Sequence, residues 1–230
     1  EKNYNLKTLE ISALINSIDH YAFSKCANLE KVIINEQYEK SFYLATSVFE
    51  NCPKLKEVYY NGSIDNWGTY YVLSSPCANG ANLYINGELV VDVDLSHLDN
   101  AAVYHNFEGV ISLKSIALPK SDWNEPFFKG CVNLESIIYP EKMKSDYIDP
   151  SCYEDCKKLK NVYIPYGCTT IHQDAFKGCE SLEKIHIPDT VTNIYPFAFT
   201  NCKSLQEVII PSSVTYLSWG AFSGCSSLRK

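Results

Sequence analysis

One fixed spacing recurs along the chain and constrains the fold more than any other feature of the sequence. An aromatic residue is followed six positions later by a leucine in copy after copy, and this spacing never varies. The aromatic positions are Phe23, Phe49, Phe107, Phe128, Tyr153, Phe176, Phe199 and Phe222, and the leucines are Leu29, Leu55, Leu113, Leu134, Leu159, Leu182, Leu205 and Leu228. Insertions fall between these units, which is typical of a solenoid, because loops tolerate changes in length and shared packing does not.

The segment after each aromatic residue predicts one short strand per coil. In LEKIHIP, Leu182, Ile185 and Ile187 are expected to point into the coil, while Lys184 and His186 point outward, since side chains on a strand alternate faces. Strands of equal size and phase are expected to stack in parallel, about 4.8 Å apart. A proline follows most of these strands, where its missing N–H ends the hydrogen-bonded ladder.

The other parts of the repeat are shorter. Residues 191–194 and 214–217 are expected to form a second extended piece in each coil, with Val and Ile or Leu inward. The AFxxC element, as at 175–179, is too short for a stable helix and predicts a tight helical turn. Residues 6–12 and 90–96 fit the strand frame as well, which gives about ten strand positions.

The full pattern, roughly xVxxIxxxAFxxCxxLxxIxIP, resembles the BspA-type leucine-rich repeats of bacterial surface proteins. The resemblance implies a right-handed, β-rich leucine-rich-repeat solenoid with a parallel β-sheet on its concave face and short strands and helical turns on the convex side. It implies one solenoid over residues 1–230, whose last coil is truncated. It also implies an extracellular or cell-surface location and a role in binding or adhesion.

One interval departs from the repeat and is predicted to be an irregular insertion over residues 61–89. Asn86-Gly87 lies between LYI and ELV, which predicts a two-residue β-hairpin turn of type I′. Residues 90–95 are then expected to serve as the next sheet strand. Trp67, Tyr70 and Tyr71 are either a binding feature or a cover for the core that the missing AFxxC element would fill.

The cysteine pattern favours buried, reduced thiols over disulfides. Seven of the 10 cysteines lie three residues after the repeat aromatic, but Val110 holds that place in one copy. Valine can replace a small apolar group and cannot replace half of a disulfide, so the slot requires volume and low polarity. Cys77 is the cysteine to which the repeat gives no role, and its redox state is left open.

Several classes of function are excluded or disfavoured by the sequence. A net charge of −7 argues against a nucleic-acid partner, and no run of apolar residues is long enough to span a membrane. No catalytic, cofactor-binding or metal-ligand motif is present, so no enzyme, cofactor or metal is expected. The nearest approach to paired carboxylates is Asp92 and Asp94, expected on one face beside Glu57, and a solvated acidic patch is the favoured interpretation.

The outward positions of the strands offer a candidate binding surface. The central outward row is Glu10, Ile33, Tyr59, Asp94, Ala117, Ile138, Tyr163, His186 and Ile209. Within it, Ile138, Tyr163, His186 and Ile209 form a strip about 15 Å long at about 4.8 Å per strand. Exposed apolar strips mark interaction surfaces, although cross-strand pairing also places such residues in sheets. The candidate partner-binding residues are Tyr59 and this strip, with Asp92, Asp94 and Trp67 as secondary candidates.

Two hypotheses for the function follow. In the first, the chain recognises a protein or glycan on a host or neighbouring cell. In the second, it is a structural spacer that projects another domain, or else a scaffold in the cytoplasm. The repeat also needs caps over its terminal coils, so either flanking sequence or end-to-end self-association is expected.

Overall fold

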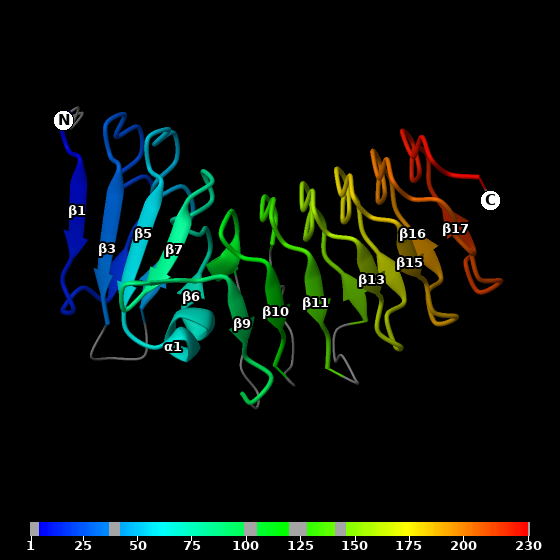
Figure 1. Ribbon diagram of the computed structural model, residues 1–230, viewed down its shortest axis with the longest axis horizontal. Coiled ribbons are helices and arrows are strands. Elements are labelled where there is room, and N and C mark those ends of the chain that lie inside the picture. Colours follow the sequence, from blue (N-terminus) through cyan, green and yellow to red (C-terminus); the bar gives the residue numbers. More distant parts are fainter. Residues whose placement is uncertain (1–4, 37–41, 99–104, 120–127, 141–145, 230) are drawn as a thin grey trace.

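The computed structural model describes residues 5–36, 42–98, 105–119, 128–140 and 146–229, and it shows an elongated β-solenoid. Successive coils stack along the long axis, with the two ends of the chain at opposite ends of the molecule (Figure 1). The predicted leucine-rich-repeat solenoid is therefore confirmed.

Each coil contributes one strand to a row that we call the main row. Its strands are β1 (Thr8–Ile11), β3 (Lys31–Asn35), β5 (Glu57–Asn61), β7 (Asn82–Ile85), β9 (Asp92–Asp94), β10 (Ser115–Ala117), β11 (Ser136–Ile138), β13 (Asn161–Tyr163) and β15 (Lys184–His186). The paired strands are parallel and keep the register of the repeat, so that Ile33 lies beside Tyr59 and Tyr163 beside His186. An isolated bridge joins Lys184 to Glu207 in the next coil.

A second row of two-residue strands runs behind the main row. It consists of β2 (Ser17–Ile18), β4 (Tyr43–Leu44) and β6 (Tyr71–Val72) in one sheet, and β12 (Tyr147–Ile148), β14 (Thr170–Ile171), β16 (Asn193–Ile194) and β17 (Tyr216–Leu217) in another. The extended pieces predicted at 191–194 and 214–217 are β16 and β17. The AFxxC elements between the rows form tight turns, as where the Cys179 N–H donates to the Phe176 carbonyl at 3.2 Å.

The core is one continuous column of apolar side chains in the described part of the chain. The repeat aromatics stack on one another from coil to coil: the Phe176 ring lies 5.1 Å from Tyr153 and 5.3 Å from Phe199, centroid to centroid. Leu159, Leu182 and all but one of the other repeat leucines are fully buried or nearly so. Each coil thus buries its apolar face against its neighbours, as repeat proteins require.

The repeat cysteines form a second column, and the structure adds a reason for cysteine that the sequence did not supply. Six of the seven repeat thiols donate a hydrogen bond to the backbone carbonyl of the aromatic residue in the preceding coil. The pairs are Cys52 to Phe23, Cys131 to Phe107, Cys156 to Phe128, Cys179 to Tyr153, Cys202 to Phe176 and Cys225 to Phe199, at 2.9–3.3 Å from Sγ to oxygen. The slot therefore uses the thiol hydrogen as well as the volume of the side chain.

All ten cysteines are free, and burial raises the pKa of Cys77 to about 12. We expect a thiol titration of the denatured, unreduced protein to give close to ten thiols per chain, and the nine buried thiols of the native protein to react far more slowly, since thiolate is the reactive form. A count near zero in the denatured protein would contradict this and would require disulfides between coils.

The predicted hairpin is present, but the interval around it is more regular than expected. Asn86 and Gly87 both have positive φ angles, of 49° and 86°, as a type I′ turn requires, and β7 pairs with β8 (Glu88–Leu89) in antiparallel fashion. The first arm of the hairpin, β7, is itself a main-row strand parallel to β5. The repeat frame missed this strand, because its coil lacks the AFxxC element.

Two further elements lie against each other in this part of the molecule. They are helix α1 (Ile64–Thr69) and the short 3₁₀ helix η1 (His105–Phe107), and both contribute buried residues. Trp67 of α1 is 1% exposed, and its indole N–H donates to the Asn106 carbonyl at 3.2 Å. Of the two interpretations of Trp67, the structure supports a cover for the core, because the buried side chain offers no surface to a partner.

Candidate functional site

The candidate site is the run of outward side chains on the C-terminal half of the main row, which we call the main-sheet strip: Ile138, Tyr163, His186 and Ile209. Ile138 is 63% exposed, Tyr163 62% and Ile209 74%, and His186 is exposed as well. They lie at the same position of successive coils, and each directly follows an inward-facing strand residue, so that its own side chain points to the opposite face. The structure thus leaves three large apolar or aromatic side chains facing water on neighbouring coils.

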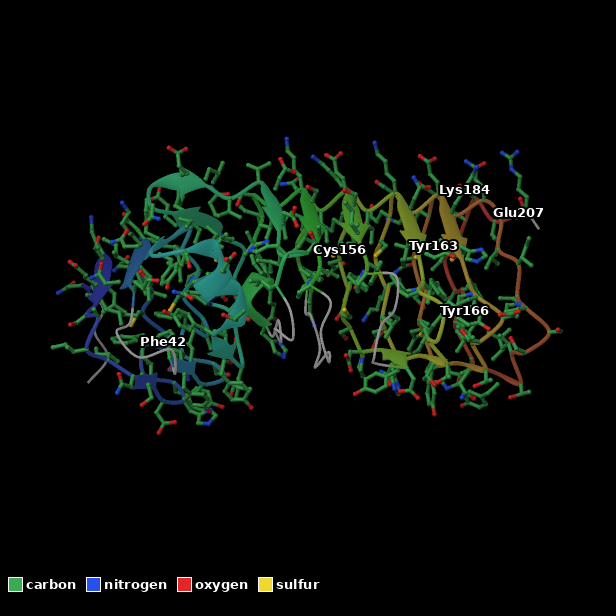
Figure 2. The ribbon with its side chains drawn as sticks, turned by 90° about the horizontal axis from the view of Figure 1, so that it is seen from below. Phe42, Cys156, Tyr163, Tyr166, Lys184 and Glu207 are labelled. Carbon is green, nitrogen blue, oxygen red and sulfur yellow. The ribbon has the colours of Figure 1, made fainter. Side chains whose placement is uncertain are left out.

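The strip has an ordered centre and a charged margin. The rings of Tyr163 and His186 stack with centroids 5.0 Å apart and planes 10° from parallel. Lys184 and Glu207 occupy the adjacent outward position, and Figure 2 shows them on neighbouring coils towards the C-terminal end. An apolar strip beside opposite charges is the composition that protein interfaces favour at their centre and rim.

A shallow groove accompanies the strip at its C-terminal end. It holds about 320 Å³ between β15 and the next coil and is lined by Glu183, Lys184, Ile185, His186, Ile187, Gln206, Glu207 and Ile209. Its floor is apolar and its rim carries both signs of charge. The groove can therefore receive a side chain from a partner that lies along the strip.

The N-terminal half of the row is different, because its side chains engage one another. The Tyr59 ring stacks on Tyr84 with centroids 4.4 Å apart, and the Lys31 ammonium lies 4.2 Å from the centre of the Tyr59 ring. Lys31 also pairs with Glu57 at 3.5 Å. Tyr59 is half-buried by these contacts, so it offers less of its surface to a partner than Tyr163 does.

Tyr84 is the residue of this row that the sequence reasoning missed. It sits on β7 beside Tyr59, in the register that the repeat frame assigned to Asp94. The alternating segment Asn82–Ile85, with Leu83 fully buried, was the signal that could have found it.

Asp92 and Asp94 lie on one face, as predicted, but not beside Glu57. Glu57 pairs in register with Asn82, because β7 stands between β5 and β9. The Asp92 carboxylate accepts a hydrogen bond from Ser115 at 2.5 Å, and Asp94 accepts one from the Ser96 N–H at 2.9 Å. The bonds from Ser96 lower the pKa of Asp94. Both carboxylates are exposed and separate from the main-sheet strip.

Metal and nucleophile chemistry find no support in the side chains that the structure describes. Within those residues, no three His, Cys, Asp or Glu side chains gather in a way that would hold a metal ion. Desolvation raises the pKa of Cys131 and of Cys179, which keeps these thiols protonated at neutral pH. The repeat cysteines are thus packing groups of the core.

The stacked parallel strands, the leucine column and the outward strip define a protein of the leucine-rich-repeat class. A family model described as the BspA type leucine rich repeat region matches residues 1–79, 103–171 and 121–230. The chain belongs to this BspA-type leucine-rich-repeat family, which confirms the resemblance drawn from its sequence. The match indicates no enzyme family.

Solved structures with the same fold come from several bacteria. A leucine-rich repeat protein from Bacteroides ovatus is similar over 96% of this chain and 62% of its own, with a TM-score of 0.63 and 19% identity. One from Eubacterium ventriosum matches 97% of this chain and 84% of its own, with a TM-score of 0.53 and 17% identity. The chain thus spans less than two thirds of the Bacteroides protein.

A third similar structure is a leucine rich cell surface protein from Faecalibacterium prausnitzii. It is similar over 97% of this chain and 84% of its own, with a TM-score of 0.50 and 19% identity. At these identities the similarity establishes the fold alone. No protein of curated function matches the sequence.

A membrane-spanning helix is not found among the described residues, where none of the helices has the length and apolar character to cross a bilayer.

Proposed function

We propose that this chain is a non-catalytic protein-binding module of a secreted or cell-surface protein, and that it holds its partner on the main-sheet strip. The observation that carries the proposal is the exposure of Ile138, Tyr163 and Ile209 at the same position of nearby coils. An apolar strip exposed to water is unfavourable. Covering it with a partner favours binding by about 25 cal/mol for each Å² of apolar surface that is removed from water.

A protein partner is favoured over a glycan by the make-up of the strip. Its ends are isoleucines, which offer no hydrogen bonds to hydroxyl groups, and its centre is a tyrosine, a residue enriched at protein interfaces. The surface location rests on the family, whose repeats occur in bacterial surface proteins, and on the similarity to the Faecalibacterium protein, which is described as a cell surface protein. Adhesion to a host or neighbouring cell is the use we propose for this binding.

A spacer function is the second candidate, and the N-terminal half of the row favours it. There the outward side chains contact one another, through the stacked rings of Tyr59 and Tyr84 and the ion pair between Lys31 and Glu57. A surface of this kind needs no partner. If the whole chain is a spacer, the exposed residues of the strip serve cross-strand packing and bind nothing.

The two functions are separated by changing the strip without changing the fold. We expect the double substitution Tyr163→Lys and Ile209→Lys to reduce binding of the labelled chain to a panel of bacterial and epithelial cells by at least tenfold. Two buried contact residues at the centre of an interface each contribute 1 kcal/mol or more, and about 1.4 kcal/mol is tenfold. The measurement is flow cytometry over a range of chain concentrations.

Tyr166→Lys is the matched control, since Tyr166 is 67% exposed and lies apart from Tyr163 (Figure 2). It introduces one lysine and removes one tyrosine ring, as the Tyr163→Lys part of the double variant does, and it should leave binding unchanged. Treating the cells with protease should abolish binding, while removing their glycans should not. Equal binding by the wild type and the double variant would support the spacer function.

A further inference from the structure

Among the described residues the main row is interrupted twice, between β7 and β9 and between β11 and β13, and the first interruption leaves a strand edge open. Strands β1, β3, β5, β7 and β8 form one sheet, and β9, β10 and β11 form another. Within the described residues, β9 pairs with β10 on one side and has no strand on the other. In Figure 1 the chain crosses from the end of β7 to the start of β9 through the hairpin.

The backbone of β9 shows which groups face the interruption. The Val91 carbonyl accepts the Ser115 N–H at 3.3 Å, and the Leu95 N–H donates to the Ala117 carbonyl at 2.9 Å, so both point towards β10. Hydrogen-bonding groups of successive strand residues point to opposite sides. The N–H and C=O of Asp92 and Asp94 therefore point away from β10, as a template on which another strand can pair.

A groove runs along this open edge. It holds about 440 Å³ and is lined by Ile64 of α1, by Ile85, Glu88, Leu89 and Val90 of the hairpin, and by Val91, Asp92, Val93 and Asp94. Leu89 is 45% exposed at its rim. The groove thus combines an unpaired strand edge with apolar walls, which is the arrangement that accepts an extended peptide as an added strand.

The charge of the groove selects the peptide. Three carboxylates, those of Glu88, Asp92 and Asp94, line it, and no lysine or arginine is among the lining residues. The low pKa of Asp94 keeps that carboxylate ionised. The same edge of a second copy carries the same negative charges and is repelled, so self-pairing of two such edges is disfavoured.

We propose that this groove, which we call the β9 groove, binds an extended basic peptide that pairs with β9 as an additional strand. Alternate residues of such a strand point to opposite faces. On one face lysine or arginine side chains meet Asp92 and Asp94, and on the other apolar side chains pack towards Val93 and Leu89. The site is separate from the main-sheet strip, so either one can fail without the other.

The probe is a short labelled peptide in which lysine and valine alternate, and fluorescence anisotropy measures its binding. The matched control peptide has glutamate in place of lysine. We expect the wild-type chain to bind the basic peptide and not the acidic one, with an affinity that falls as salt is added. Asp92→Asn should weaken binding severalfold, because one carboxylate is lost.

Asp92→Pro distinguishes strand pairing from charge attraction. Proline removes the Asp92 N–H, which the β9–β10 ladder does not use, and proline is tolerated on the free side of an edge strand. We expect a further loss of about fivefold relative to Asp92→Asn, because one hydrogen bond contributes about 1 kcal/mol. Circular dichroism and urea unfolding of the two variants should agree.

Hydrogen exchange supplies a second measurement that needs no substitution. Bound peptide should slow exchange of the Asp92 and Asp94 amides and leave the Val93 amide unchanged, since that amide already faces β10. Equal affinity of the asparagine and proline variants, equal binding of the two peptides, or an absence of binding to the wild type would each overturn the proposal.

Discussion

Replacing Phe176 with alanine is expected to lower the free energy of unfolding by about 3–5 kcal/mol, the range measured for truncating a buried phenylalanine. Phe176 is fully buried, and its ring stacks on Tyr153 and Phe199, with interplanar angles of 16° and 3°. In a solenoid each coil contacts only its neighbours, so no distant part of the chain can move in to fill the cavity. Urea unfolding followed by circular dichroism gives the free energy.

Phe176→Leu is the matched control, because leucine keeps most of the buried apolar area and removes the ring stacking. We expect it to retain the larger part of the stability that alanine loses. The slope of the free energy with urea should stay near the wild-type value in both variants if the whole array unfolds together. A loss below about 1 kcal/mol for the alanine variant would mean that the aromatic column is not a continuous core.

The sequence predicts the regular part of this fold well, because every strand position is tied to the next by the same spacing. Once Phe176 and Leu182 are placed in the core, alternation along the strand that follows has one register that buries Ile185 and Ile187 as well. The outward position of Tyr163, His186 and Ile209 follows from the same alternation. For this reason the main-sheet strip is recovered from the sequence residue by residue.

The sequence does not predict the features that depend on contacts made by coils that depart from the repeat pattern. The repeat frame passes over β7 because its coil has Ser74 and Gly80 where other coils have the aromatic residue and the leucine, although Cys77 keeps the usual spacing from the strand. It therefore places Asp94 next to Tyr59, where the structure has Tyr84. The open edge of β9 and the groove beside it follow from the hairpin's path in space, which no local pattern encodes.

The hydrogen bonds of the repeat cysteines also cannot be predicted from the sequence of one coil, because their acceptors lie in another coil. The sequence shows that the slot accepts a small apolar group, since valine replaces cysteine at Val110. The acceptor for the Cys179 thiol, the Tyr153 carbonyl, lies 26 residues earlier and is set by how the coils stack. The acceptor can be identified only when the alignment of adjacent coils is known.

Asn106 is the residue whose importance is hardest to see in the sequence, and its replacement by alanine is expected to lower the free energy of unfolding by about 2–6 kcal/mol. The side chain is fully buried, and its amide nitrogen donates to the Trp67 carbonyl at 2.6 Å and to the Tyr70 carbonyl at 3.0 Å. Both carbonyls lie at the C-terminal end of α1, where helical carbonyls have no partner within the helix. Alanine leaves two buried acceptors unsatisfied, at about 1–3 kcal/mol each.

Asn133→Ala is the control for Asn106→Ala, because the Asn133 amide makes one such bond, to the Ile111 carbonyl at 2.7 Å, from a half-buried position. We expect it to cost about 0.5–1.5 kcal/mol. Urea unfolding measures both losses, and tryptophan fluorescence reports on Trp67, which α1 holds against Asn106. If the two variants lose the same stability, Asn106 does not anchor α1 to η1. If Asn106→Ala loses much more and exposes Trp67 while the array stays folded, this one amide keeps the inserted segment packed on the solenoid core.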